Sequence, residues 1–156
     1  MTNTLELLTA HPFLAGLPPG WVEHLAGQVR QVGYPAGFRI FREGEPAEHF
    51  WLIDSGRVAV DIHLPGRGDV LIETLPAGTV LGWSWLSPPY RWHFGAIAIE
   101  LTHTVQFDAA GVTQLCDASP ELGSELRRRF IAVLADRLQA TRVRLLDLYA
   151  HPVVPA

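Results

Sequence analysis

The sequence predicts a mainly β protein: a jelly-roll barrel (a double-stranded β-helix) with flanking helices and a long C-terminal helix. Two observations predict this class. Between residues 31 and 108, apolar and polar side chains alternate in short runs, and Gly or Pro turns separate the runs. On both sides of this region the apolar spacing is helical. We therefore divide the chain into an N-terminal helical segment (1–30), a β-barrel (31–108) and C-terminal helices (109–150).

The N-terminal segment contains two short helical patterns. The first covers Thr2–Ala10, with Asn3 or Thr4 as its N-cap, and Pro12 ends it. The second covers Trp21–Val29 and follows a Pro-Pro-Gly turn. Both have ordinary amphipathic spacing, so we expect them to be packing segments.

The barrel region contains about eight predicted strands. Gly44, Gly56 and Gly78 lie where the chain reverses between strands, and glycine supplies the positive φ of such turns without steric cost. The strands cover Val32–Tyr34, Phe38–Arg42, His49–Asp54, Val58–Leu64, Val70–Leu75, Thr79–Leu81, Ala96–Leu101 and Thr104–Phe107.

One connection between strands, Gly78–Ala98, is strongly aromatic. It holds Trp83, Trp85 and Trp92, which are three of the five tryptophans of the chain. Two consecutive prolines within it exclude regular structure. Functional residues often lie on connections that a rigid scaffold positions, so we expect any ligand pocket here.

The C-terminal segment predicts a short helix over Asp108–Cys116 and then a long one. Ser119-Pro120-Glu121 has the residue types of a helix start, and the helical pattern continues to about Tyr149. This is longer than one barrel face requires, which favours pairing with another copy; a helix packed only on its own barrel is the alternative. The apolar residues expected at the dimer interface are Leu126, Phe130, Leu134, Leu138 and Leu145.

Composition limits the classes of function. The 156-residue chain has a net charge of −4 and a single cysteine, Cys116, which fits a reducing cytoplasm. No apolar run is long enough to span a membrane. The only basic cluster, Arg127–Arg129, is most simply a solvated helix face, so we expect neither nucleic acid nor membrane as a partner.

Three segments resemble the cyclic nucleotide-binding domain of the catabolite activator protein superfamily, of kinase regulatory subunits and of gated channels. Ile40–Ala47 (IFREGEPA) is similar to the first glycine turn of that family, and Phe50–Val60 (FWLIDSGRVAV) to its next hairpin. Leu75–Gly82 (LPAGTVLG) leads into the place of its phosphate-binding cassette. The resemblance implies the jelly-roll fold and a sensory or regulatory role without catalysis.

The same resemblance exposes two departures. Members that bind cyclic AMP or GMP have a glutamate after the cassette glycine, where this chain has Trp83. They place an arginine for the phosphate where this chain has Trp92, with Arg91 one residue earlier. Each lost charge-assisted contact costs on the order of 1.5–3 kcal/mol. We therefore expect no tight binding of either nucleotide.

Three interpretations of the aromatic cassette remain open. The favoured one is an aromatic pocket for another small ligand of unknown identity. In the second, the tryptophans fill the space of a nucleotide and the domain is a ligand-free, dimeric interaction module. In the third, Arg91 turns inward and makes a weak cyclic-nucleotide site. The predicted ligand-binding residues are Gly82, Trp83, Ser84, Trp85, Arg91, Trp92, His93 and Phe94.

Other chemistry is not indicated. The seven histidines form no metal-ligand motif, and the Gly82-Trp83-Ser84-Trp85 sequence lacks the second glycine of a nucleophile elbow. We predict no enzyme activity, no catalytic or metal-binding residues and no cofactor. The partners expected are a second copy through the C-terminal helix and, as an alternative, a separate protein. Only His151–Ala156 follow Ala150, so no DNA-binding domain is expected.

Overall fold

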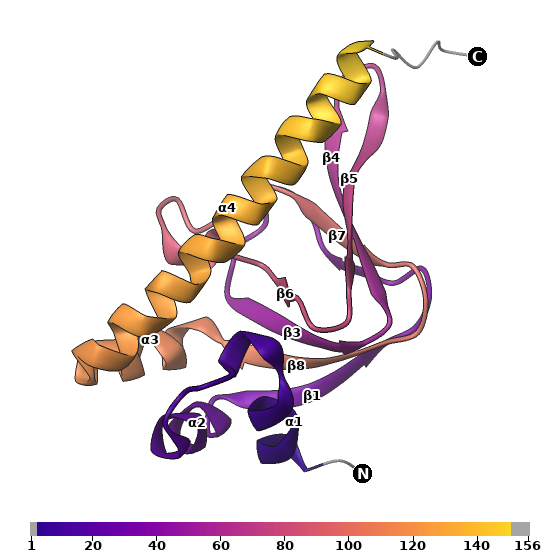
Figure 1. Cartoon of the computed structure of the whole chain (residues 1–156). Coiled ribbons are helices and arrows are strands. Elements are labelled where there is room, and N and C mark those ends of the chain that lie inside the picture. The colour runs from indigo at the N-terminus through magenta and orange to yellow at the C-terminus, as the bar shows by residue number, and fades with distance from the viewer. Residues whose placement is uncertain (1–2, 151–156) are drawn as a thin grey trace.

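The computed structural model describes residues 3–150 as two four-stranded antiparallel sheets, with α4 crossing the barrel diagonally (Figure 1). The sheet orders are β1-β8-β3-β6 and β2-β7-β4-β5. This is the predicted jelly-roll with flanking helices. The strands are β1 (Val29–Tyr34), β2 (Arg39–Phe41), β3 (His49–Ser55), β4 (Arg57–Leu64), β5 (Gly68–Pro76), β6 (Val80–Leu81), β7 (Gly95–Ala98) and β8 (Thr102–Asp108). The helices are α1 (Thr4–Ala10), η1 (Pro12–Leu14), α2 (Pro19–Ala26), η2 (Ser84–Leu86), α3 (Ala109–Ala118) and α4 (Pro120–Ala150).

The N-terminal helices cover the end of the first sheet near β1 and β8 (Figure 1). Asn3 caps α1 by accepting a hydrogen bond from the Leu5 amide at 2.8 Å. The predicted start at Thr2, and His151–Ala156 at the other end, lie outside the described residues. The second predicted helix extended too far, because Val29 already pairs with Phe107 as the first residue of β1.

Strand β3 is buried on both faces, by α4 on one side and by the opposite sheet on the other. Phe50 stacks on Phe107 with ring centroids 4.4 Å apart, and it meets Phe130 of α4 edge-on at 5.1 Å. Trp51 faces the other way, toward Phe41 of β2 at 5.5 Å. The strand therefore separates the barrel interior from the layer that contains α4.

The glycines predicted at chain reversals have positive φ: +86° at Gly44, +94° at Gly56 and +87° at Gly78. Gly56 also has no room for a side chain, since an added Cβ would lie 2.5 Å from the Leu101 carbonyl oxygen. Predicted strand 96–101 is too long, because β7 ends at Ala98 and the chain turns there toward β8.

Helix α4 lies against its own barrel for much of its length. Leu126 and Phe130, expected at a dimer interface, are 3% and 1% exposed and belong to the protein's own core. They are buried because α4 begins against α3 and β3 and only later leaves one side free. Leu138 and Leu145 are 71% and 52% exposed. Among residues 3–150, no helix combines the length and the apolar character that a bilayer crossing demands.

Candidate ligand site

The cassette, residues 82–94, connects β6 to β7 across the mouth of the barrel. It begins at Gly82, whose φ of +95° bends the chain away from β6. One turn of 3-10 helix, η2, follows immediately. Two backbone hydrogen bonds fix the end of the cassette to the turn after β2. The Trp92 amide donates to the Glu45 carbonyl oxygen at 2.9 Å, and the Gly44 amide donates to the Trp92 carbonyl oxygen at 2.8 Å.

Trp92 points into the barrel. Its ring stacks on Phe41 with centroids 3.9 Å apart and an interplanar angle of 16°, and Trp51 lies beyond at 5.8 Å. A Cβ added to Gly82 would lie 3.0 Å from the Trp92 ring. Glycine is therefore needed at position 82 for its conformation and also for the close approach of this indole.

Trp83 is half-buried and lies at the edge of the barrel interior that Trp92 enters. Its ring stacks on His93 at 4.8 Å and meets Phe94 edge-on at 6.1 Å. The Ser84 hydroxyl oxygen accepts from the His93 amide at 3.2 Å and lies 2.9 Å from His93 Nδ1. Ser84 is 2% exposed, so its hydroxyl is shielded from solvent, and its contacts with His93 hold the two ends of the cassette together.

Trp85 lies on the opposite side of the cassette, away from the barrel interior. It stacks on Phe50 at 5.0 Å and contacts Phe130 of α4 edge-on at 5.3 Å. Its indole N–H is buried and has no hydrogen-bond partner among the described residues. The eight predicted ligand-binding residues thus do not surround one space. Five of them line the interior cavity, Trp85 lines the outer side of the cassette, and Arg91 and His93 line neither: the five are Gly82, Trp83, Ser84, Trp92 and Phe94.

Arg91 points out of the barrel. Its guanidinium donates to the Gly44 carbonyl oxygen at 2.8 Å, and the side chain is exposed. The preceding residue, Tyr90, has a φ of +56°, which directs the chain back toward the turn after β2. Arg91 does not line the interior cavity.

The space left inside the barrel is very small. The cavity beneath the cassette has a volume of about 20 Å³. Its lining includes Phe41, Glu73, Trp83, Ser84, Trp92, Phe94 and Arg137. A volume of this size holds about one water molecule, whereas ligand pockets usually measure about 300–1,000 Å³. The aromatic side chains fill the interior.

Two charged residues at this cavity were not anticipated from the sequence. Arg137 of α4 donates to the Glu73 carboxylate of β5 at 3.2 Å and to the Val80 carbonyl oxygen at 2.9 Å. The second carboxylate oxygen of Glu73 is buried without a hydrogen-bond partner among residues 3–150. Burial raises the pKa of Glu73, and the charge of Arg137 opposes that rise. The only sequence signal was a cation on the barrel-facing side of the helix.

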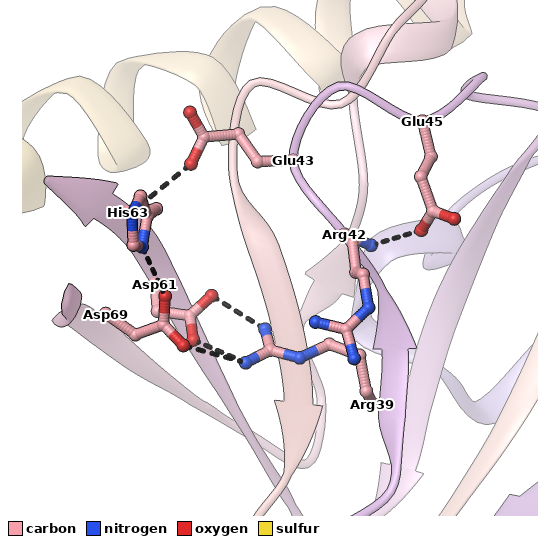
Figure 2. A network of polar contacts seen from close by, with 7 residues as sticks. All are labelled: Arg39, Arg42, Glu43, Glu45, Asp61, His63 and Asp69. Atoms are coloured by element: carbon pink, nitrogen blue, oxygen red, sulfur yellow. Dashed lines mark hydrogen bonds and ion pairs between the residues drawn. The ribbon is translucent and has the colours of Figure 1, made fainter. Parts of the chain in front are cut away.

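A second polar cluster joins β2 to the β4–β5 hairpin (Figure 2). Arg39 forms two hydrogen bonds with Asp61, at 2.8 and 2.9 Å, and these raise the pKa of Arg39. Asp69 lies 3.8 Å from Arg39 and 3.1 Å from His63. Within residues 3–150 no three side chains are arranged as metal ligands. The cluster ties β2 to the β4–β5 hairpin within the second sheet, with Arg39 shared between the two carboxylates.

A larger hollow lies on the outer side of the cassette. It has a volume of about 570 Å³, between the cassette and helices α3 and α4. Trp85, Leu86 and Tyr90 line it from the cassette, and Leu126 and Arg127 line it from α4. Its size suits a small molecule.

The fold agrees with the comparisons. The sequence pattern of the family described as "cyclic nucleotide-binding domain" matches residues 31–119, so the chain belongs to this family. It is 27% identical over 143 residues to the CRP-like cAMP-activated global transcriptional regulator of Mycobacterium tuberculosis. That match covers 92% of this chain but 62% of the regulator, so the chain spans less than two thirds of that relative.

One further protein is similar in sequence, and one solved structure is similar in fold. Over 75 residues the chain is 36% identical to Acetyltransferase Pat of Mycolicibacterium smegmatis, covering 48% of this chain and 22% of the acetyltransferase. The fold superposes on a cyclic nucleotide-binding domain from Methylobacillus flagellatus with a TM-score of 0.78 and 20% identity, covering 98% of this chain and 84% of that one. The domain is thus of a regulatory type that also occurs in a relative named as an enzyme.

Proposed function

We propose that this protein is a non-catalytic regulatory domain of the cyclic nucleotide-binding family whose nucleotide pocket is closed by its own aromatic side chains. It acts without cyclic AMP or cyclic GMP, and it pairs with a second chain through α4. The observation that carries the proposal is the interior cavity of about 20 Å³ beneath the stacked pair Trp92 and Phe41.

The chemistry of the cassette supports the same conclusion. A cyclic nucleotide brings a phosphate and a ribose hydroxyl, which need a cation and an acceptor in a desolvated pocket. The two positions that would supply them are Trp92 and Trp83, and an indole offers only one N–H and an aromatic face. Arg91 is engaged with the Gly44 carbonyl oxygen outside the barrel, which disfavours the weak nucleotide site considered above.

The free side of α4 supports the pairing. Ile131, Leu138 and Leu145 are 65%, 71% and 52% exposed and recur every seven residues. Ala135, Arg142 and Tyr149 alternate with them, which gives the four–three spacing of a coiled-coil seam. We call these six residues the α4 stripe. Of the predicted interface it keeps Leu138 and Leu145. It leaves out Leu126 and Phe130, which are buried in the chain's own core, and Leu134, which is half-buried.

The test is a titration of the purified protein with cyclic AMP and cyclic GMP, followed by calorimetry and by tryptophan fluorescence. We expect no saturable signal up to about 1 mM nucleotide, which corresponds to less than about 4 kcal/mol of binding free energy. The M. tuberculosis regulator, whose name describes it as cAMP-activated, serves as the positive control. Saturable binding at micromolar concentration would overturn the closed pocket.

A second candidate function keeps the aromatic ligand site but moves it to the outer hollow of about 570 Å³. A ligand there would contact Trp85 and α4 together, and it could bias their packing if it bound one arrangement more tightly. A metabolite panel read by tryptophan fluorescence distinguishes the two candidates. A response that Trp85→Phe abolishes and Trp92→Phe preserves would favour the outer site.

A further inference from the structure

We propose that Arg142 is the specificity-determining residue of the α4 stripe: it weakens pairing between identical copies and selects a partner helix that carries a carboxylate opposite it. This inference rests on the pairing through α4 proposed above and goes beyond it by defining the chemistry of the preferred partner. The partner is a second chain whose α4-like helix presents an apolar seam with an acid in the middle.

The position of Arg142 within the stripe is the first argument. It lies between Leu138 and Leu145, one helical turn from each, so a helix that covers these leucines also covers Arg142. Both leucines are exposed by more than half. A guanidinium in such a seam has to find an acceptor in the partner or lose hydration without compensation.

The lack of an internal partner is the second argument. Arg128 lies on the same side of α4, two heptads earlier, and Glu125 of the same helix neutralises it at 2.8 Å. Arg142 is exposed and forms no ion pair with any residue in the described range 3–150. The nearest acid in sequence, Asp147, is engaged by Arg144 at 2.8 Å.

Pairing of two identical copies makes this cation costly. In a parallel, in-register pair of helices each seam residue faces its own counterpart, so Arg142 faces a second Arg142. The stripe contains no acid that a shifted register could offer instead, since its other members are Ile131, Ala135, Leu138, Leu145 and Tyr149. A single charged seam residue specifies the partner at a cost in stability, and like charges suppress the wrong pairing.

The experiment uses the protein itself and its Arg142→Glu variant as the acid-bearing partner. Isotope-labelled wild type and unlabelled variant are mixed in equal amounts, and native mass spectrometry counts the three dimers. We expect more mixed dimer than the statistical share, and high salt should reduce the excess because it screens the new ion pair. Arg142→Leu alone should tighten self-association about tenfold or more, measured by analytical ultracentrifugation.

Arg30→Glu on β1 is the matched control: it makes the same change of net charge at an exposed residue far from the stripe, and it should give a statistical mixture. Circular dichroism verifies that each variant is folded. A mixed dimer that forms although neither protein self-associates supports the role of Arg142 and restricts the pairing proposed above to chains that differ at this position. Statistical mixing of stable dimers overturns the role of Arg142 and leaves the pairing intact. Monomers in every mixture overturn both.

Discussion

Trp92 fills part of the barrel interior beneath the cassette. Its indole lies between Phe41 and Gly82: it stacks on the Phe41 ring and lies close to the Gly82 backbone. Large aromatic side chains contribute strongly to a core when they are buried, and Trp92 is 5% exposed. The residue that the family resemblance led us to expect at a phosphate contact therefore lies in the core.

Removing this indole should destabilise the folded protein strongly. We expect Trp92→Ala to lower the free energy of unfolding by about 3–5 kcal/mol, because a fully packed ring is lost and the cavity beneath it grows. Urea denaturation measures the change. Trp83→Ala is the comparison, since Trp83 is only half-buried and should cost clearly less. Equal losses for the two variants would contradict the view that Trp92 contributes more to the interior packing than Trp83.

At the scale of single residues, sequence reasoning located the cassette but not the direction of its side chains. The aromatic content of residues 83–94 is visible in the sequence, and the resemblance to the family implied the displaced cation. That Trp85 packs on α4 while Trp92 packs on Phe41 depends on the φ angles of Gly82 and Tyr90. Those angles follow from tertiary packing, so no local pattern reveals them.

The elements were more predictable than the contacts between them. The turn glycines and the Ser119-Pro120-Glu121 helix start follow local rules of backbone geometry, and they lie where the sequence placed them. The burial of Leu126 and Phe130 was missed because one helix here serves two surfaces in succession. A continuous apolar stripe gives no sign of where the first surface ends and the second begins.

Helix α4 is joined to β5 by a charge pair whose effect should depend on pH. Burial raises the pKa of Glu73 in the folded protein above its ordinary value of 4.5. The stability associated with this group is therefore complete below pH 4.5 and decreases as pH rises through the raised pKa. Glu73→Gln removes this dependence.

We accordingly expect the free energy of unfolding of Glu73→Gln, relative to wild type, to increase between about pH 4 and pH 7. Urea denaturation at several pH values measures it. The exposed residue Glu121, changed to Gln, should show no such trend. A relative stability that falls with pH would mean that the attraction of Arg137 outweighs the burial of Glu73.

At the scale of the whole molecule, the sequence indicated both the fold and the family, because the glycine turns and the order of strands depend on the entire barrel. The sequence left open whether the aromatic side chains of the cassette line an open pocket or fill it. That distinction is a matter of volume, and volume is set by side chains from β2, β5, the cassette and α4 together. No single segment carries the information.

The closure of the pocket by aromatic side chains can be tested by introducing a carboxylate at position 83 and a guanidinium at position 92. In the double variant Trp83→Glu with Trp92→Arg, both indoles are removed, a carboxylate and a guanidinium are supplied, and space opens beside Glu73 and Arg137. We expect cyclic AMP binding by calorimetry where the wild type shows none, because charge-assisted contacts each contribute about 1.5–3 kcal/mol. The control, Trp83→Gln with Trp92→Met, opens similar space without charge and should stay silent. Silence of both folded variants would mean that the backbone of the cassette, and not only its side chains, has left the nucleotide-binding geometry.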